Sequence, residues 1–228
     1  MLTTINTTEE KLLHAQETTL RWFEAVEKNN LIRPGKYESQ LVSEMLELGE
    51  REFGITEHWH KKIVRTGLNT LATYSENPAD RMIQEDDILF LDFGPIINGY
   101  EADLGRTYVL GNDPGKLRAK QDVEKAWYDV WNWYKQQTTL KASDVYQYVL
   151  ETASLYGWTF TGDIAGHIVG KYPHEQPADP KSLELDIHPT NHNDIFLRDA
   201  NGNKRHWVLE LQFIDIEKEI GGYFEQLL

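Results

Sequence analysis

Apolar residues recur at helical spacing in the first part of the chain. Over residues 8–29 they stand three or four positions apart, which predicts an amphipathic helix with Thr7 or Thr8 as its cap. A Pro-Gly break follows, and similar spacing over residues 38–53 predicts a second helix that ends at Gly54. The chain is therefore expected to open with a pair of helices.

Shorter apolar runs with strand character follow this pair, and the same order of elements then repeats. The predicted elements are strands near 63–64, 88–93 and 100–110, helices at 117–137 and 143–156, and strands near 167, 208–215 and 223–228. Two units of helix, helix, strand and hairpin predict an α+β fold with two pseudo-symmetric halves. These halves, about residues 1–112 and 113–228, are expected to share one core as a single domain, because no low-complexity linker separates them.

Each predicted hairpin carries a pair of carboxylates. Asp92 and Asp103 flank an Asn-Gly turn signal at residues 98–99, and Glu210 and Glu225 flank a reversal that contains a Gly-Gly pair. Folding about these turns is expected to bring each pair nearly opposite, where Cβ atoms lie roughly 4.5–5.5 Å apart and like charges repel. A cation is the simplest way to neutralise them.

His167 lies between the two hairpins in sequence, among glycines that let a ligand approach the backbone closely. With the four carboxylates it makes a mixed oxygen and nitrogen ligand set, which suits manganese, cobalt, iron or zinc. Two divalent ions would balance four negative charges at the spacing of roughly 3.5–4 Å found in two-metal hydrolases. Taken singly, each residue is more simply interpreted as an ordinary surface or core side chain, so the prediction rests on their paired placement.

Composition narrows the range of partners. A chain of 228 residues with 40% hydrophobic content can bury a substantial core, and its formal net charge of −14 argues against nucleic acid or an anionic membrane surface. There is no cysteine, which excludes thiolate metal sites. Because no basic leader or long apolar span is evident, a cytoplasmic protein is expected. Aromatic residues clustered over 127–134 are expected to pack in the core or to support a homodimer.

The motifs around these residues resemble those of the pita-bread (creatinase/aminopeptidase) family of metallopeptidases, which includes methionine aminopeptidase, aminopeptidase P and prolidase. The matching residues are Asp92, Phe93, Gly94, Gly99, Tyr100, Asp103, Arg106, Thr107, His167, Gly170, His174 and Glu175. The resemblance covers nearly the whole chain and implies the pita-bread fold around a central metal site. The residue pattern over 99–107 looks most like that of the Xaa-Pro peptidase branch. The resemblance implies that this chain corresponds to the catalytic domain alone.

The resemblance implies a centre with two divalent metal ions, of which manganese is favoured. Asp92 would chelate one ion, and His167 with Glu210 would complete the other. Asp103 and Glu225 would bridge the two. A water or hydroxide shared by the ions would attack the scissile carbonyl, and Glu210 would pass a proton to the departing amine.

The same resemblance gives a catalytic role to His174, which would donate a hydrogen bond to the substrate or to the oxyanion. Capping a turn is the alternative role. The chain also departs from the family pattern, because Tyr74 and Ser75 stand where the peptidases usually carry a substrate-binding histidine. His60 is a possible substitute, although a surface position is the simpler interpretation. Glu210 lacks the proline that usually follows it.

The sequence therefore predicts a dinuclear metal-dependent peptidase that hydrolyses an amino-terminal or Xaa-Pro bond of a short peptide. One alternative is a metalloenzyme of the same fold that acts on a small non-peptide, amide-like substrate, which the Ser75 substitution keeps open. Another is a catalytically silent binding module of the same fold. Clustered carboxylates without metal would be costly in a low-dielectric site, which favours an enzyme.

Overall fold

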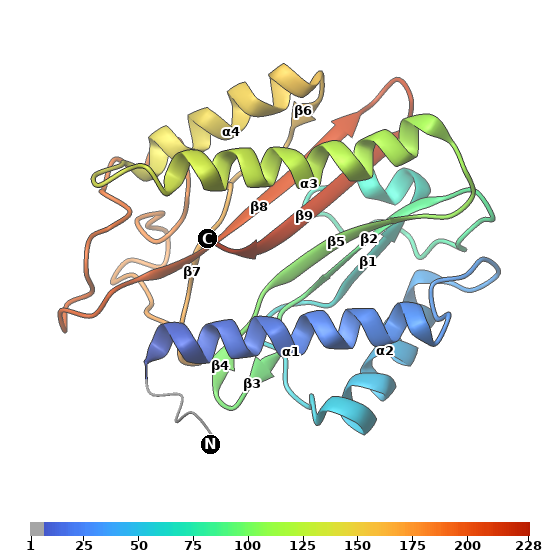
Figure 1. The fold of residues 1–228 in the computed structure, drawn as a ribbon, viewed down its shortest axis with the longest axis horizontal. Coiled ribbons are helices and arrows are strands. Elements are labelled where there is room, and N and C mark those ends of the chain that lie inside the picture. Colours follow the sequence, from blue (N-terminus) through green and yellow to red (C-terminus); the bar gives the residue numbers. More distant parts are fainter. Residues whose placement is uncertain (1–6) are drawn as a thin grey trace.

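The computed structural model describes residues 7–228, which form four α-helices, one short 3-10 helix, a seven-stranded antiparallel sheet and a separate two-stranded hairpin (Figure 1). In chain order these are α1 (Thr8–Lys28), α2 (Glu38–Phe53), β1 (Ile63–Thr66), η1 (Gly67–Leu71), β2 (Ile88–Phe93), β3 (Ile96–Ile97), β4 (Tyr100–Glu101), β5 (Leu104–Val109), α3 (Pro114–Tyr134), α4 (Ala142–Tyr156), β6 (Thr159–Phe160), β7 (Ile168–Val169), β8 (His206–Asp215) and β9 (Ile220–Leu227). The sheet order is β1-β2-β5-β9-β8-β6, and β7 pairs with β8. Two helices followed by strands occur twice, which confirms the predicted α+β class.

The helix ends follow their capping residues. The Thr7 side chain accepts a hydrogen bond from the Glu10 backbone, while the Glu10 carboxylate accepts one from the Thr7 backbone, so α1 begins where the sequence predicted. Gly54 ends α2 in the left-handed conformation, with φ of 66°. The third helix begins earlier than predicted, because Asp113 caps it and Pro114 occupies its first turn.

Alternate side chains on the central strands point to opposite faces of the sheet. On β2, Leu89 and Leu91 pack in the core beside α1 and α2, whereas Asp92 faces a cavity on the other side. On β8, Leu209 packs in the core beside α3 and α4, whereas Glu210 faces the same cavity. The helices therefore cover one face of the sheet, and carboxylates line the other.

A narrow seam joins the two halves of the sheet, since β5 belongs to the first half and β9 to the second (Figure 1). The two strands share one registered pair, Gly105 with Glu225. Next to it, the Thr107 hydroxyl donates to the Tyr223 carbonyl and accepts from the Tyr223 backbone N–H, both at 2.7 Å. Side-chain bonds thus supplement a short backbone ladder at this position.

The aromatic cluster on α3 is mainly core. Trp127 is fully buried, and its indole N–H donates to the Leu209 carbonyl at 2.8 Å. Trp131, Trp133 and Tyr134 pack partly buried against the same core. Homodimerisation through this helix stays a prediction. Within residues 7–228, no helix has the length and apolar character needed to cross a membrane.

Candidate metal centre

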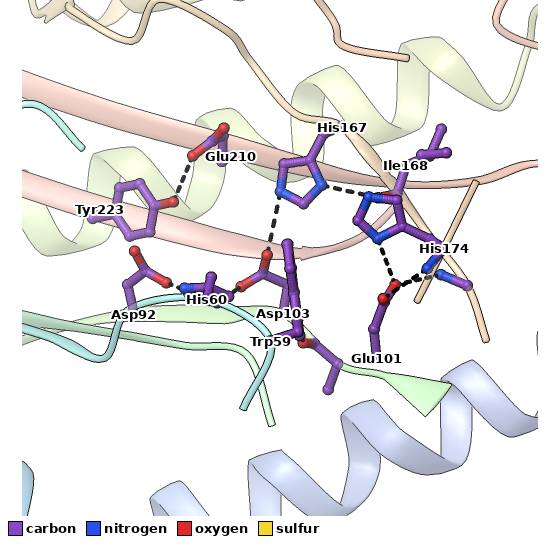
Figure 2. A network of polar contacts seen from close by, with 12 residues as sticks. Trp59, His60, Asp92, Glu101, Asp103, His167, Ile168, His174, Glu210 and Tyr223 are labelled. Atoms are coloured by element: carbon purple, nitrogen blue, oxygen red, sulfur yellow. Dashed lines mark hydrogen bonds and ion pairs between the residues drawn. The ribbon is translucent and has the colours of Figure 1, made fainter. Parts of the chain in front are cut away.

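A cavity of about 310 Å³ lies on the face of the sheet that the helices leave uncovered. Figure 2 shows several of the polar side chains that line it, among them Asp92, Asp103 and His167. All the residues predicted as metal ligands line it, namely Asp92, Asp103, His167, Glu210 and Glu225. Tyr74 and Ser75, which replace the usual histidine, line it as well. The fold thus gathers residues from both halves of the chain around one space.

The two carboxylate pairs differ in register. Glu210 and Glu225 lie directly opposite each other on β8 and β9, as predicted. Asp92, however, lies opposite Gly105, so the expected facing position of Asp103 is wrong by two residues. The physical reason is that the two-residue turn at 98–99 pairs Ile97 with Tyr100 in the β3–β4 hairpin, and the same register continued into β2 and β5 places Asp92 opposite Gly105. Asp103 precedes β5 directly and still reaches the cavity.

His167 is oriented by its backbone surroundings. Its Nδ1–H donates to the Ile168 carbonyl at 3.0 Å, which leaves Nε2 facing Asp103 Oδ2 at 3.3 Å. A hydrogen bond from the far nitrogen is the usual way in which proteins orient metal-binding histidines. Just before it, Gly166 has φ of 144°, and a Cβ there would lie 2.0 Å from the Val208 carbonyl oxygen, so the β8 backbone packs closely against this glycine. Approach of a ligand to these glycines stays a prediction.

His60 belongs to the same cluster, and the expectation that it lies on the surface is wrong. Its side chain is 7% exposed, and Nε2 lies 3.1 Å from Asp103 Oδ1 and 3.7 Å from Asp92 Oδ1 (Figure 2). The ring packs edge-on to Trp59, with ring centroids 4.6 Å apart. The neighbouring tryptophan was the signal in the sequence, because a large aromatic ring beside a histidine is more typical of a packed segment than of a solvated loop.

The two glutamates have different partners. Glu210 Oε2 accepts a hydrogen bond from the Tyr223 hydroxyl at 2.7 Å. Glu225 is 2% exposed, and its Oε2 has no hydrogen-bond partner among the described residues. A buried carboxylate oxygen without a donor is costly, so this atom is one that a cation would satisfy.

His174 lies beside the cluster, where Figure 2 shows it between His167 and Glu101. Its Nδ1–H donates to Glu101 Oε2 at 2.9 Å, and its backbone N–H donates to Glu101 Oε1 at 3.1 Å. The Trp59 ring is also near, with centroids 5.5 Å apart. The residue is therefore positioned by Glu101, and its contact with a substrate stays a prediction.

Burial and crowding of charge perturb the titration of the whole cluster. Burial raises the pKa of Asp92 to about 7 and raises that of Glu225 well above its ordinary value. Burial opposes the charged form of both imidazoles, yet Asp103 and the other carboxylates outweigh it and raise the pKa of His60 and of His167 to about 9. The same histidines overcome burial at Asp103 and hold the pKa of that carboxyl below its usual range. Without metal, the cluster holds protons that a cation would displace.

The donor set fits two divalent cations. One group of donors contains His60, Asp92 and Asp103, and a second contains Asp103, His167 and Glu225, with the atoms of each group within 4.8 Å of one another. Asp103 is common to both, and its two oxygens face different imidazoles. Oxygen and nitrogen donors of this kind suit borderline and hard divalent ions.

Comparison with known proteins agrees with this chemistry. Residues 10–199 match the profile of metallopeptidase family M24. The chain belongs to family M24. A methionine aminopeptidase from Aquifex aeolicus is 28% identical over 106 residues, which cover 46% of this chain and 40% of that protein. A methionine aminopeptidase from Clostridium acetobutylicum is 29% identical over 118 residues, which cover 46% of that protein. The chain therefore spans less than half the length of these two curated relatives.

Solved structures show the fold of the M24 chain. A prolidase from Thermococcus sibiricus has a TM-score of 0.74 at 23% identity, over 96% of this chain and 55% of the prolidase. A methionine aminopeptidase from Thermotoga maritima has a TM-score of 0.70 at 17% identity, over 98% of this chain and 93% of the other. These likenesses confirm the predicted pita-bread architecture.

Proposed function

We propose that this M24 protein is a dinuclear metal-dependent peptidase that hydrolyses an amino-terminal or Xaa-Pro bond of a short peptide. The observation that carries the proposal is the placement of Asp103, whose Oδ1 and Oδ2 face His60 and His167 at 3.1 and 3.3 Å. A carboxylate with a nitrogen donor at each oxygen is suited to bridge two ions. Family membership and the buried, unpartnered oxygen of Glu225 support the same conclusion.

The predicted ligands would hold two ions, with Asp92 on one, His167 and Glu210 on the other, and Asp103 and Glu225 between them. Manganese is the favoured metal, with cobalt, iron and zinc as the other candidates. Bound there, the pair would lower the pKa of a shared water and polarise the scissile carbonyl.

The chain itself supplies the proton transfer. Burial raises the pKa of the Glu210 carboxyl, which moves it toward the range in which a carboxyl both accepts and releases a proton near neutral pH. The Tyr223 hydroxyl holds one oxygen of Glu210 in place at 2.7 Å. The Glu101 carboxylate accepts a hydrogen bond from Nδ1–H of His174, so Nε2 of His174 is the ring atom available to a substrate carbonyl.

The residues that line the cavity suit a short, partly apolar substrate. Ile63, Phe90, Phe160 and Ile164 line it together with the acidic cluster. Apolar walls with a few convergent polar groups are typical of small-ligand sites and exclude water from the reacting bond. A dipeptide or the amino end of a longer peptide suits a cavity of about 310 Å³.

A small non-peptide, amide-like compound is the second candidate substrate. It is favoured by Tyr74 and Ser75, which line the cavity where the peptidases usually carry a substrate-binding histidine. The same metal chemistry would serve this reaction, so the two candidates differ in the group that anchors the substrate.

The test is hydrolysis of Xaa-Pro dipeptides, Xaa-Pro-Yaa tripeptides and methionine-initiated peptides after chelation and readdition of Mn²⁺ or Co²⁺. Metal-restored cleavage is expected, and Asp103→Asn should lower it by on the order of 100-fold because it removes the bridging carboxylate. Asp86→Asn is the matched control, since the Asp86 side chain is 77% exposed and outside the cavity.

Each result has a distinct meaning. Cleavage that needs metal and is lost in Asp103→Asn supports the peptidase, and the preferred peptide identifies the branch. Uptake of two equivalents of metal without cleavage of any peptide refutes the peptidase and favours the non-peptide substrate. Absence of metal uptake refutes the site itself.

A further inference from the structure

His60 reaches the metal centre from a part of the chain that supplies no other predicted ligand. It lies in the connection between α2 and β1, ahead of both hairpins. The Nε2 atom points at the same two aspartates that are predicted to hold one of the ions (Figure 2). The question is whether the ring merely pairs with Asp103 or binds the metal.

The distances match those between two ligands of one ion. Metal–ligand bonds in such sites are about 2.0–2.2 Å, so two ligands at right angles lie about 3.0 Å apart and two at about 120° lie about 3.6 Å apart. His60 Nε2 lies 3.1 Å from Asp103 Oδ1 and 3.7 Å from Asp92 Oδ1. His167, a predicted ligand, lies at a similar 3.3 Å from the other oxygen of Asp103. The two imidazoles therefore stand in equivalent positions at the two ends of one carboxylate.

Packing holds the His60 ring in this position. A Cβ on Gly94 would lie 2.1 Å from His60 Cδ2 and 2.2 Å from Nε2, so the ring rests directly on the backbone of the residue after β2. Trp59 covers another side, and its indole N–H is tied to the Ala102 carbonyl at 2.9 Å. His60 Nδ1 is buried without a hydrogen-bond partner among the described residues. Steric contacts, rather than a second hydrogen bond, aim Nε2 at the aspartates.

We propose that His60 Nε2 is a sixth protein ligand of the centre and binds the ion that Asp92 and Asp103 hold. The inference rests on the proposed dinuclear site and adds a nitrogen donor to it. Each ion then has one imidazole, His60 on one side of Asp103 and His167 on the other. A neutral imidazole adds no charge, so the balance between four carboxylates and two divalent ions is kept.

This ligand changes the metal preference of one position. With Asp92 and bridging carboxylates alone, the first ion would have oxygen donors from the protein, a set that suits manganese or magnesium. A nitrogen donor favours cobalt, zinc or iron relative to those ions. The His60 ion should therefore discriminate more strongly for cobalt over manganese than an all-oxygen position would.

The experiment is metal titration of the chelated protein by calorimetry, combined with pulsed electron paramagnetic resonance of the Mn²⁺-loaded protein to count directly bound nitrogens. Wild type should take up two equivalents and show two histidine nitrogens. His60→Ala should weaken the binding of one equivalent by about tenfold or more and lose one nitrogen signal. His192→Ala, which changes an exposed histidine hydrogen-bonded to Ser143, should match wild type.

A second variant separates binding from folding and from hydrogen bonding. His60→Gln keeps a polar side chain that can donate to Asp103, but an amide is a poor substitute for imidazole on a metal, so it should behave as His60→Ala does. Circular dichroism of both chelated variants checks that they fold. The inference is overturned if either folded variant keeps both equivalents at wild-type affinity with two bound nitrogens. Failure of wild type to bind two equivalents overturns the dinuclear site itself, and the inference with it.

Discussion

Replacing Gly94 by alanine places one methyl group against the rings that enclose the centre. Its Cβ would lie 2.1 Å from the His60 ring and 2.5 Å from Trp59 Nε1, whereas ordinary contact begins at 3.4 Å. The His60 ring must therefore move from 2.1 Å to about 3.4 Å, a shift of about 1.3 Å. The indole cannot yield easily, because its N–H is bonded to the Ala102 carbonyl at 2.9 Å.

Two effects of Gly94→Ala are expected. Overpacking should lower the free energy of unfolding of the chelated protein by about 1–3 kcal/mol, measured by guanidinium chloride titration with tryptophan fluorescence. A shift of this size also moves Nε2 out of its ligand position. Calorimetric titration should therefore show one metal equivalent weakened by about tenfold.

The matched control is Gly170→Ala, another glycine beside the centre. Its Cβ would lie 3.5 Å from the Cβ of His174, which is an ordinary contact, so stability and metal binding should stay near those of wild type. If Gly94→Ala is as stable as Gly170→Ala and binds metal equally well, the described packing of His60 against the backbone is refuted.

Three further outcomes are expected. Neighbouring carboxylates raise the pKa of both site histidines to about 9, and burial raises that of Asp92 to about 7, so the folded, metal-free protein binds more protons than the unfolded chain. Its melting temperature should fall as pH rises from about 6.5 to 9, above the range in which the lowered pKa of His58, about 4, opposes this effect. A rise over that range would contradict these shifts. Tyr223→Phe removes the hydrogen bond to Glu210 and should lower kcat about tenfold or more, with two metal equivalents still bound. An unchanged kcat would refute a role for Tyr223 in orienting Glu210. Gly166→Ala should cost more than about 3 kcal/mol in chemical denaturation, because its Cβ would meet the Val208 carbonyl at 2.0 Å, and wild-type stability would refute that close approach.

Local signals made much of the fold predictable. The Thr7 capping box and the Gly54 stop are short-range patterns, and they placed the ends of α1 and α2 correctly. The apolar run of β2 was recovered at its observed bounds, residues 88–93. The start of α3 was predicted at residue 117, three residues after its observed start at Pro114. The cap at Asp113 and the proline at 114 are also short-range signals, so this boundary too was open to prediction from the sequence.

The parts that were missed depend on distant contacts. The register of Asp92 is an exception, because counting outward from the two-residue turn at 98–99 pairs Asp92 with Gly105. The two lysines that follow His60 favour a surface position in the sequence, whereas in the folded chain the backbone of Gly94 lies against its ring. Contacts of this type, between a loop and the end of a strand 34 positions later, are visible only in the folded chain.

The seam between β5 and β9 has a consequence for the lifetime of the protein. The first half of the chain supplies His60, Asp92 and Asp103, and the second supplies His167, Glu210 and Glu225. Within the main sheet, β5 and β9 join the halves through one registered pair, Gly105 and Glu225. Ions bound across that junction would cross-link the halves and, at 100 times the dissociation constant, add about 2.7 kcal/mol to stability. In a metal-starved cell the protein would then lose activity and resistance to proteolysis together, so metal supply would set its abundance as well as its turnover.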